Sequence, residues 1–246
     1  NHWMFIASNG GLTAGRKNPE LSLFPYYTDD KIIESADITG SKSVFQIRAD
    51  DQIHVWEPFS VRFAGKYSIS RNLYKSIYGN KIIFEEINHD FGLIFRYQWN
   101  SSKVYGFVKK SALANTSDKD YKITLLDGLQ NIMPYGVPSD LQRSTSNLVD
   151  AYKRSELEPE SGTGIFALSA IIVDKAEPSE ALKANIAWSL GLDHPKYLLS
   201  SLQLDHFRQG GAISEETDIK GEKGAYFVCK EILLPARSEK NWKLIA

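Results

Sequence analysis

Adjacent pairs of acidic residues are the first feature of the sequence that could carry chemistry, because glycoside hydrolysis uses two carboxyl groups. Neighbouring residues of a β-strand point to opposite faces of the sheet, so no adjacent pair can place both carboxyls across one bond. We therefore interpret the pairs as solvated charges at turns and strand edges. They are Asp29-Asp30, Asp50-Asp51, Glu85-Glu86 and Glu215-Glu216.

The five histidines form no metal-binding pattern, because no two have the spacing that places both imidazoles on one face of a strand or helix. A metal site needs several convergent ligands, so we predict no metal and no other cofactor. Three histidines could still act with a glutamate as the acid and base of an aldose epimerase. The groups available for that chemistry are His54, His89 and His206 with Glu57, Glu85 or Glu86.

No nucleophile or phosphate-binding motif is complete. The sequence contains no Gly-x-Ser-x-Gly motif, and Cys229 lies in an apolar alternating stretch, where we expect a buried, unreactive thiol. The glycine-rich residues 10–16 lack the Lys-Ser/Thr ending of a phosphate loop, and no helical pattern follows them. We interpret them as part of a tight hairpin between residues 4–8 and 12–16.

The elements that position these groups are predicted by alternation of apolar and polar residues with a period of two, which is typical of β-strands. Residues 91–100 show the pattern most clearly. The short turn sequences between most strands favour antiparallel pairing, which predicts an all-β fold of two stacked sheets. The other predicted strands are 44–49, 53–56, 67–75, 81–87, 104–114, 121–129, 164–173, 181–190 and 225–234.

One segment has helical rather than alternating spacing. Residues 139–154 follow Pro138 and place apolar residues at helical intervals, which predicts one helix inserted midway between two groups of strands. Residues 155–163 are rich in Glu, Pro, Ser and Gly, and we predict a loop there. Residues 198–207 fit a helix and a strand equally well.

The composition limits which kinds of partner the chain can bind. The chain has 246 residues, with 29 Lys and Arg against 30 Asp and Glu, and this balance argues against a nucleic-acid partner. No apolar run is long enough to span a membrane, so we predict no membrane partner. The single cysteine favours the cytoplasm. Aromatic residues make up 12% of the chain, which suits β-sheets and also surfaces that stack on sugar rings.

The order of several motifs resembles that of the N-terminal domain of glycoside phosphorylases of the cellobiose and chitobiose phosphorylase type. Residues 3–11 and 13–16 are similar to the opening strand and Ser-Asn-x-x-Gly-Gly turn of that family. Residues 43–48 and 53–58 resemble its Tyr-Ile-Arg-Asp and Val-Trp-Ser-Pro step, although Glu57 replaces the small residue between Trp and Pro. The weaker similarities, at 27–32, 74–78, 82–85, 111–117 and 228–234, follow in the same order.

This resemblance implies a β-supersandwich, like galactose mutarotase, that occupies residues 1–246. In the family an (α/α)6 barrel follows the sandwich and carries the general acid and the phosphate site. The resemblance therefore implies that this chain is a piece of a longer protein and holds no catalytic residue. It also implies that the partners are the chain's own barrel, a second copy in a homodimer, and an oligosaccharide at the rim of the active site. A neighbouring hydrolase family with the same two-domain plan fits almost as well.

Four residues near turns or on mixed strands are the candidates for a surface that binds sugar or meets the barrel: Arg16, Tyr26, Tyr27 and Trp56. Packing inside the sandwich is the alternative for each of them. Phe95, Trp99 and Trp188 lie on strongly alternating strands, and we predict that they belong to the core. Two other functions stay open, an autonomous mutarotase-like epimerase and a free-standing carbohydrate-binding module.

Overall fold

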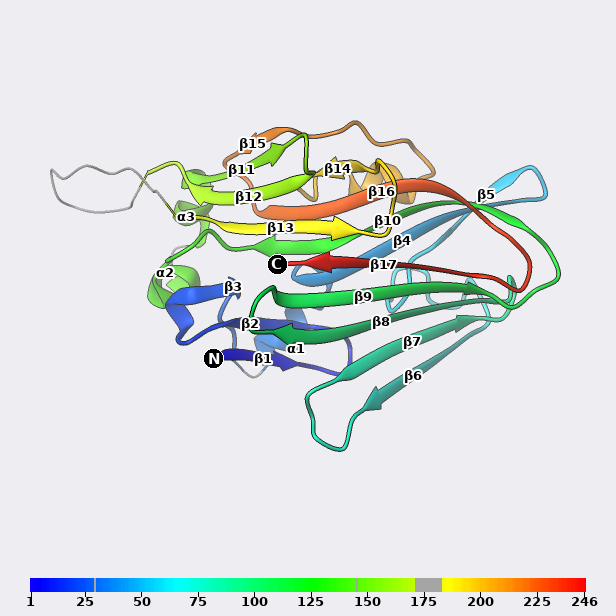
Figure 1. Cartoon of the computed structure of the whole chain (residues 1–246), viewed down its shortest axis with the longest axis horizontal. Coiled ribbons are helices and arrows are strands. Elements are labelled where there is room, and N and C mark those ends of the chain that lie inside the picture. Colours follow the sequence, from blue (N-terminus) through cyan, green and yellow to red (C-terminus); the bar gives the residue numbers. More distant parts are fainter. Residues whose placement is uncertain (29, 145, 171–182) are drawn as a thin grey trace, which may run out of the picture.

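The computed structural model describes residues 1–28, 30–144, 146–170 and 183–246, and it consists mostly of β-strands. These strands form three sheets in which neighbouring strands run antiparallel (Figure 1). The predicted all-β antiparallel sandwich is thereby confirmed. Alternation with a period of two identifies such strands because each one buries only every second side chain.

The smaller of the two main sheets has β10 at its centre. This strand pairs with β16 on one side and β4 on the other along most of its length, so both of its edges are hydrogen-bonded. The order of the sheet is β14 (Lys196–Leu198), β16 (Gly224–Leu234), β10 (Tyr121–Ile132), β4 (Gly40–Ala49) and β5 (Gln52–Trp56).

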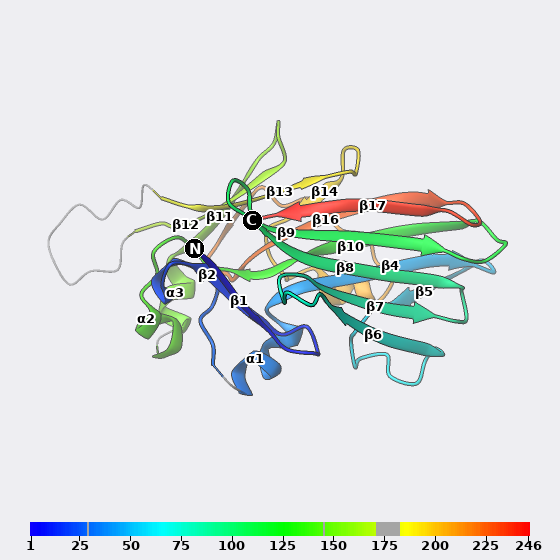
Figure 2. The same ribbon diagram turned by 60° about the horizontal axis from the view of Figure 1, so that its bottom comes forward.

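The larger sheet has nine strands, and Figure 2 shows its strands β17, β9 and β8 running alongside β16, β10 and β4 of the smaller sheet. It ends at β6, whose residues are almost all exposed. Its order is β15 (Asp218–Lys220), β11 (Lys153–Glu158), β12 (Thr163–Leu168), β13 (Asn185–Leu190), β17 (Glu239–Ile245), β9 (Gly106–Asn115), β8 (Leu93–Ser102), β7 (Ile82–Asn88) and β6 (Ile69–Lys75).

Aromatic side chains fill the space between the two main sheets. The ring centre of Phe45 in β4 lies 5.0 Å from that of Phe95 in β8, and Phe95 stacks on Trp242 of β17. Phe95 and Trp99 are both buried, so their prediction as core residues is confirmed. The outer face of the five-stranded sheet has its own apolar cluster under helix α4 (Leu204–Arg208), which contributes Leu204 and Phe207.

The third sheet contains the predicted hairpin. Strands β1 (His2–Ile6) and β2 (Leu12–Arg16) pair directly, β3 (Ser22–Phe24) joins β2, and Figure 2 shows β1 and β2 at an angle to the long strands. A short helical segment follows, made of α1 (Asp30–Glu34) and the 3-10 helix η2 (Ser35–Asp37), and the 3-10 helix η1 (Pro19–Leu21) precedes β3.

The middle of the chain differs from the prediction. Two helices, α2 (Ser139–Ser144) and α3 (Ser146–Tyr152), stand where one was expected, and β11 (Lys153–Glu158) begins in the last two residues of the predicted helix and continues into the predicted loop. Strand β11 forms because β12 and β15 pair with both of its edges, which no local pattern reveals. Residues 198–207 contain the end of β14 and then α4. Residues 171–173 and 181–182 of two predicted strands lie outside the described residues. None of the helices in the described ranges is long and apolar enough to cross a membrane.

Candidate functional site

The four predicted site residues lie in different places. Trp56 is 1% exposed, its ring lies 5.4 Å from that of Phe45, and its indole N–H donates to Glu86 at 2.7 Å. Its prediction as a residue that meets a sugar or a partner domain is therefore wrong, because the inter-sheet core covers the ring. Tyr26 is half-buried, with its ring at a right angle to that of Trp3.

Tyr27 and Arg16 line separate cavities. Tyr27 is half-buried at a small cavity of about 50 Å³ beside Asn131 and Lys153. Burial raises the pKa of Tyr27, and a hydrogen bond with Asn131 opposes that shift. Arg16 is exposed at the end of β2 and lines a larger cleft, described below. The structure therefore does not bring the four residues into one site, and whether Arg16, Tyr26 and Tyr27 bind a sugar stays a prediction.

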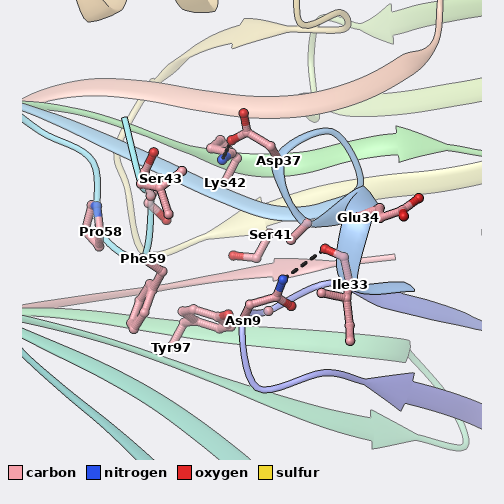
Figure 3. Close-up of a pocket in the computed structure, with 14 residues that line it drawn as sticks. Asn9, Ile33, Glu34, Asp37, Ser41, Lys42, Ser43, Pro58, Phe59 and Tyr97 are labelled. Atoms are coloured by element: carbon pink, nitrogen blue, oxygen red, sulfur yellow. Dashed lines mark hydrogen bonds and ion pairs between the residues drawn. The ribbon is translucent and has the colours of Figure 1, made fainter. Parts of the chain in front are cut away.

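A polar pocket of about 220 Å³ opens where the β1–β2 turn, η2, β4 and the loop after β5 meet (Figure 3). We call it the Lys42 pocket, and it is lined chiefly by Asn9, Asp37, Lys42, Ser43, Phe59 and Tyr97. Figure 3 shows the two aromatic rings on one side and Lys42 with Asp37 on the other. The pocket joins the two best-matched motifs of the sequence, since Asn9 comes from the first and Pro58 ends the second.

Three charged side chains at this pocket, Asp37, Lys42 and Glu57, form ion pairs with one another. Lys42 Nζ lies 2.6 Å from Asp37 Oδ1 and 3.1 Å from Glu57 Oε1. Glu57 is buried, and Arg208 of α4 donates two hydrogen bonds to its carboxylate at 2.8 and 2.9 Å. Arg62 pairs with the second oxygen of Asp37 at 2.6 Å. Asp37 and Glu57 are therefore each paired with two basic side chains.

The backbone at the pocket is held in an unusual conformation. Phe59 has a φ of 64°, a region that bulky residues seldom adopt, and its N–H donates to Glu86 Oε2 at 2.7 Å. Gly10 also has a positive φ, and a Cβ at this position would lie 2.9 Å from the Tyr97 hydroxyl. The ring of Phe59 stands edge-on to that of Tyr97 at 5.4 Å. A strained residue is retained where its surroundings fix it, and here a buried carboxylate does so.

Burial corrects the interpretation of Glu85 and Glu86 as solvated charges, since they are 4% and 1% exposed. Arg71 of β6 lies across from Glu86, and Arg96 of β8 lies across from Glu85, and each arginine pairs with its glutamate. Burial by itself raises the pKa of Glu85, but hydrogen bonds from Asn72, Arg96 and the neighbouring tyrosine hydroxyl lower it overall. Only the strand register shows which arginine meets which glutamate.

Of the other adjacent acidic pairs, one is exposed and one has a buried member. Asp50 and Asp51 are both exposed at the β4–β5 turn, as predicted, whereas Glu216 is buried and accepts hydrogen bonds from the backbone of Leu199 and Ser200. Asp29 lies outside the described residues.

A second buried charge pair below the Lys42 pocket was not predicted. Lys109 Nζ and Asp127 Oδ1 are 2.5 Å apart, and both side chains are fully buried. Ser43, which lines the pocket, donates to the same carboxylate. Burial lowers the pKa of Lys109, and Asp127 opposes that shift. The sequence did contain a signal for the burial of Lys109. It lies two positions after Phe107 in β9, so both side chains point to the core face of the strand.

The histidines and the cysteine form no metal site or reactive group within the described residues. In the described ranges no histidine hydrogen bonds to a carboxylate, and His89 bonds to Ser70 at 2.8 Å. No group of three or more acidic, histidine or cysteine side chains converges on a metal-sized site in the same ranges. Cys229 is buried, and burial raises the pKa of its thiol to about 11. Very little thiolate then exists at neutral pH, which agrees with the predicted unreactive thiol.

We expect the contribution of Asp37 to stability to vanish in acid. Partial burial raises the pKa of Asp37, but Lys42 and Arg62 outweigh it and hold the pKa below its ordinary value. A carboxyl with a lowered folded-state pKa stabilises the fold above the unfolded pKa, about 4, and loses that effect as the pH falls further. Because Asp37 is 43% exposed, Asp37→Asn should cost no more than about 1 kcal/mol at pH 7.

Urea unfolding of the wild type and Asp37→Asn at pH 7 and pH 3 measures this contribution. The difference in unfolding free energy should shrink at pH 3. A difference of equal size at both pH values would contradict the assignment.

A second opening, the Arg16 cleft, has a volume of about 300 Å³ and contains aromatic side chains. Tyr105 from the β8–β9 turn is 59% exposed, Tyr135 after β10 is 37% exposed, and Trp188 of β13 is half-buried. Asn185 lines the same cleft. Trp188 points away from the core because the neighbouring Ala187 occupies the inner face of β13, so its prediction as a core residue is wrong.

Comparisons with known proteins place the chain in no family. No family model and no curated protein matches it. Among solved structures, a human-microbiome protein described as a kojibiose phosphorylase has 13% identity and a TM-score of 0.32, with 82% of this chain and 22% of that chain covered. The 4-alpha-glucanotransferase of Thermococcus litoralis has 11% identity and a TM-score of 0.34, with 96% and 34% covered.

A heparinase III has 9% identity and a TM-score of 0.32, with 100% of this chain and 34% of that chain covered. These structural neighbours are thus a glycoside phosphorylase, a glucanotransferase and a heparinase. This chain spans at most 34% of the length of each.

Proposed function

We propose that the chain is a non-catalytic β-sandwich domain of a carbohydrate-active enzyme, and that the Arg16 cleft binds a saccharide. The cleft itself supports the proposal most directly. Three accessible or half-buried aromatic rings stand beside an arginine that makes no ion pair with any described residue. Sugars offer C–H faces to aromatic rings and hydroxyls to guanidinium and amide groups, so Arg16, Tyr105 and Trp188 supply complementary chemistry.

The ion pairs of the buried carboxylates support the non-catalytic part of the proposal. Acid–base catalysis needs a group that can exchange a proton with the substrate. Glu57, Glu86 and Asp127 instead lie buried with arginine or lysine partners. Catalysis would then belong to a second domain. The motif resemblance favours an (α/α)6 barrel as that domain in a glycoside phosphorylase or hydrolase, with a homodimer as the assembly.

Calorimetric titration with cello- and chito-oligosaccharides tests the binding. We expect Trp188→Ala and Tyr105→Ala each to weaken it about tenfold, because each removes a ring worth about 1.4 kcal/mol. Tyr78→Ala is the matched control, since Tyr78 is 84% exposed and does not line the Arg16 cleft. The affinity of this control should equal that of the wild type.

Two outcomes would contradict the proposal. Absence of heat with every saccharide, or unchanged affinity in Trp188→Ala, would remove the sugar site. Phosphorolysis or hydrolysis of a disaccharide by this chain alone would remove the non-catalytic role. The same cleft fits the second candidate, a free-standing carbohydrate-binding module, and removal of the domain from the full-length protein separates the two. If the chain is a non-catalytic domain of an enzyme, the full-length protein without it should lose activity or solubility.

A further inference from the structure

A third opening, the Lys75 cleft, lies between β1 and the β6–β7 end of the nine-stranded sheet. Its volume is about 570 Å³, more than twice that of the Lys42 pocket. Strand β1 forms one wall, the β6–β7 hairpin forms another, and Trp99 of β8 and Phe107 of β9 contribute from the sheet.

The walls of this cleft combine apolar surface with positive charge. The apolar part comes from β1, β6 and β7, chiefly Met4, Phe5, Leu73 and Ile82, and Phe5 and Leu73 are 58% and 45% exposed. Accessible side chains of this kind, gathered at one cleft, form a surface that an apolar ligand can cover.

All the charge at the cleft is positive. Lys75 and Lys81 are exposed, and neither makes an ion pair with a described residue. The aliphatic stem of Lys75 passes beside the hairpin turn, since a Cβ added at Gly79 would lie 3.5 Å from it. None of the described residues that line the cleft is Asp or Glu. The site therefore favours a negative charge on whatever binds.

Trp99 adds an unused hydrogen-bond donor. Its side chain lines the cleft, is 2% exposed, and stands edge-on to Phe24 at 6.2 Å, which fixes the ring. Its indole nitrogen is buried and has no hydrogen-bond partner among the described residues. Buried donors normally have partners, and an indole N–H can only donate, so a suitable partner is an acceptor such as a carboxylate oxygen.

We propose that the Lys75 cleft binds an amphiphilic carboxylate, a molecule with an apolar aryl or alkyl body and one carboxyl group. The body covers Phe5, Leu73 and Ile82, and the carboxylate lies near Lys75 and Lys81 and accepts a hydrogen bond from Trp99. The requirement for both parts follows from the walls. Neither a simple anion nor a neutral hydrocarbon satisfies the apolar and the cationic surfaces together. This proposal does not rest on the proposed saccharide site, although Phe107 lines both clefts.

Titration with three ligands that share one body tests the proposal. 4-Phenylbutanoate should bind, 4-phenylbutan-1-ol should bind at least about tenfold more weakly, and 4-phenylbutylamine should show no binding. Lys75→Gln together with Lys81→Gln should weaken the carboxylate about tenfold and leave the alcohol unchanged. Lys110→Gln is the matched control, because Lys110 is exposed on β9 and does not line the cleft.

Nuclear magnetic resonance of the indole N–H groups gives a second readout. The five tryptophans give five side-chain signals, and Trp99→Phe identifies the one from Trp99. If that variant does not fold, sequential assignment of the wild type identifies it instead. 4-Phenylbutanoate should move the Trp99 signal downfield. Equal affinity for all three ligands, unchanged affinity in the double lysine variant, or a stationary Trp99 signal in the saturated protein would each overturn the proposal.

Discussion

Asp127→Ala is expected to destabilise the fold by about 3–5 kcal/mol, because it leaves Lys109 buried without a counter-charge. The carboxylate of Asp127 accepts four hydrogen bonds of 2.5–2.9 Å, from Lys109, Ser43, Ser111 and the Trp242 indole. Two of these donors belong to β9 and one to β17, whereas Asp127 and Ser43 belong to the five-stranded sheet. The loss would therefore separate the two main sheets at their centre. Urea unfolding at pH 7 measures it.

A double variant separates the charge from the packing. Lys109→Met removes the buried ammonium, and Asp127→Asn keeps an oxygen that can accept from the serines and Trp242. Because a buried pair can be replaced by uncharged groups at small cost, this combination should be more stable than Asp127→Ala alone. Glu231→Ala is the control at an exposed pair, since Lys122 and Glu231 are 53% and 45% exposed, and it should cost less than about 1 kcal/mol.

The prediction for Asp127 fails on either of two results. Equal destabilisation in Glu231→Ala and Asp127→Ala would show that burial does not set the cost. A double variant no more stable than Asp127→Ala would show that the uncompensated lysine is not its source.

Glu86→Ala is expected to cost about 3 kcal/mol and to collapse the Lys42 pocket. The Glu86 carboxylate accepts hydrogen bonds from the Trp56 indole, the Phe59 backbone and Arg71, each at 2.7 Å. Buried donors left without a partner cost about 1–3 kcal/mol each, and Trp56 is 1% exposed. Phe59 would also lose the contact that holds its φ at 64°, so its ring should leave the pocket wall. Urea unfolding and a crystal structure of the variant measure the two effects.

The neighbouring glutamate provides the control for this variant. Glu85 is also buried, but its partners Asn72, Tyr74 and Arg96 are exposed or half-buried and can turn to water when it is removed. Glu85→Ala should therefore cost less than Glu86→Ala and leave Phe59 in place. A larger cost for Glu85→Ala, or an unchanged Phe59 conformation in Glu86→Ala, would contradict the role given to Glu86.

Local pattern predicted most of the strands because it depends on properties that each strand carries alone. Residues 91–100 alternate without interruption, and β8 occupies Leu93–Ser102. Strand β11 shows the limit, because Lys153–Glu158 has four charged residues and becomes a strand only between β12 and β15. Pairing between distant segments stabilises it, and that pairing is invisible to a local reading.

The prediction of site residues failed where two faces of one strand had to be distinguished. Trp56 and Trp188 both lie in alternating strands, yet one is buried between the sheets and the other lines the Arg16 cleft. Tyr105 and Tyr135 were not predicted, because they lie in turns whose position beside Arg16 depends on how three separate strands end. Residue type indicates what a side chain can bind, but burial decides whether it is reachable.

The sequence alone determined the all-β class, the antiparallel pairing, the β1–β2 hairpin and the aromatic core, since each follows from the period of two and from turn chemistry. Tertiary structure decided which charged residues became partners. Asp127 and Lys109 are 18 positions apart in the sequence, and Glu57 and Arg208 are 151 positions apart. Each pair meets only because the two sheets and α4 pack against one another. Side-chain alternation is a local property, whereas desolvation and charge pairing depend on the whole fold.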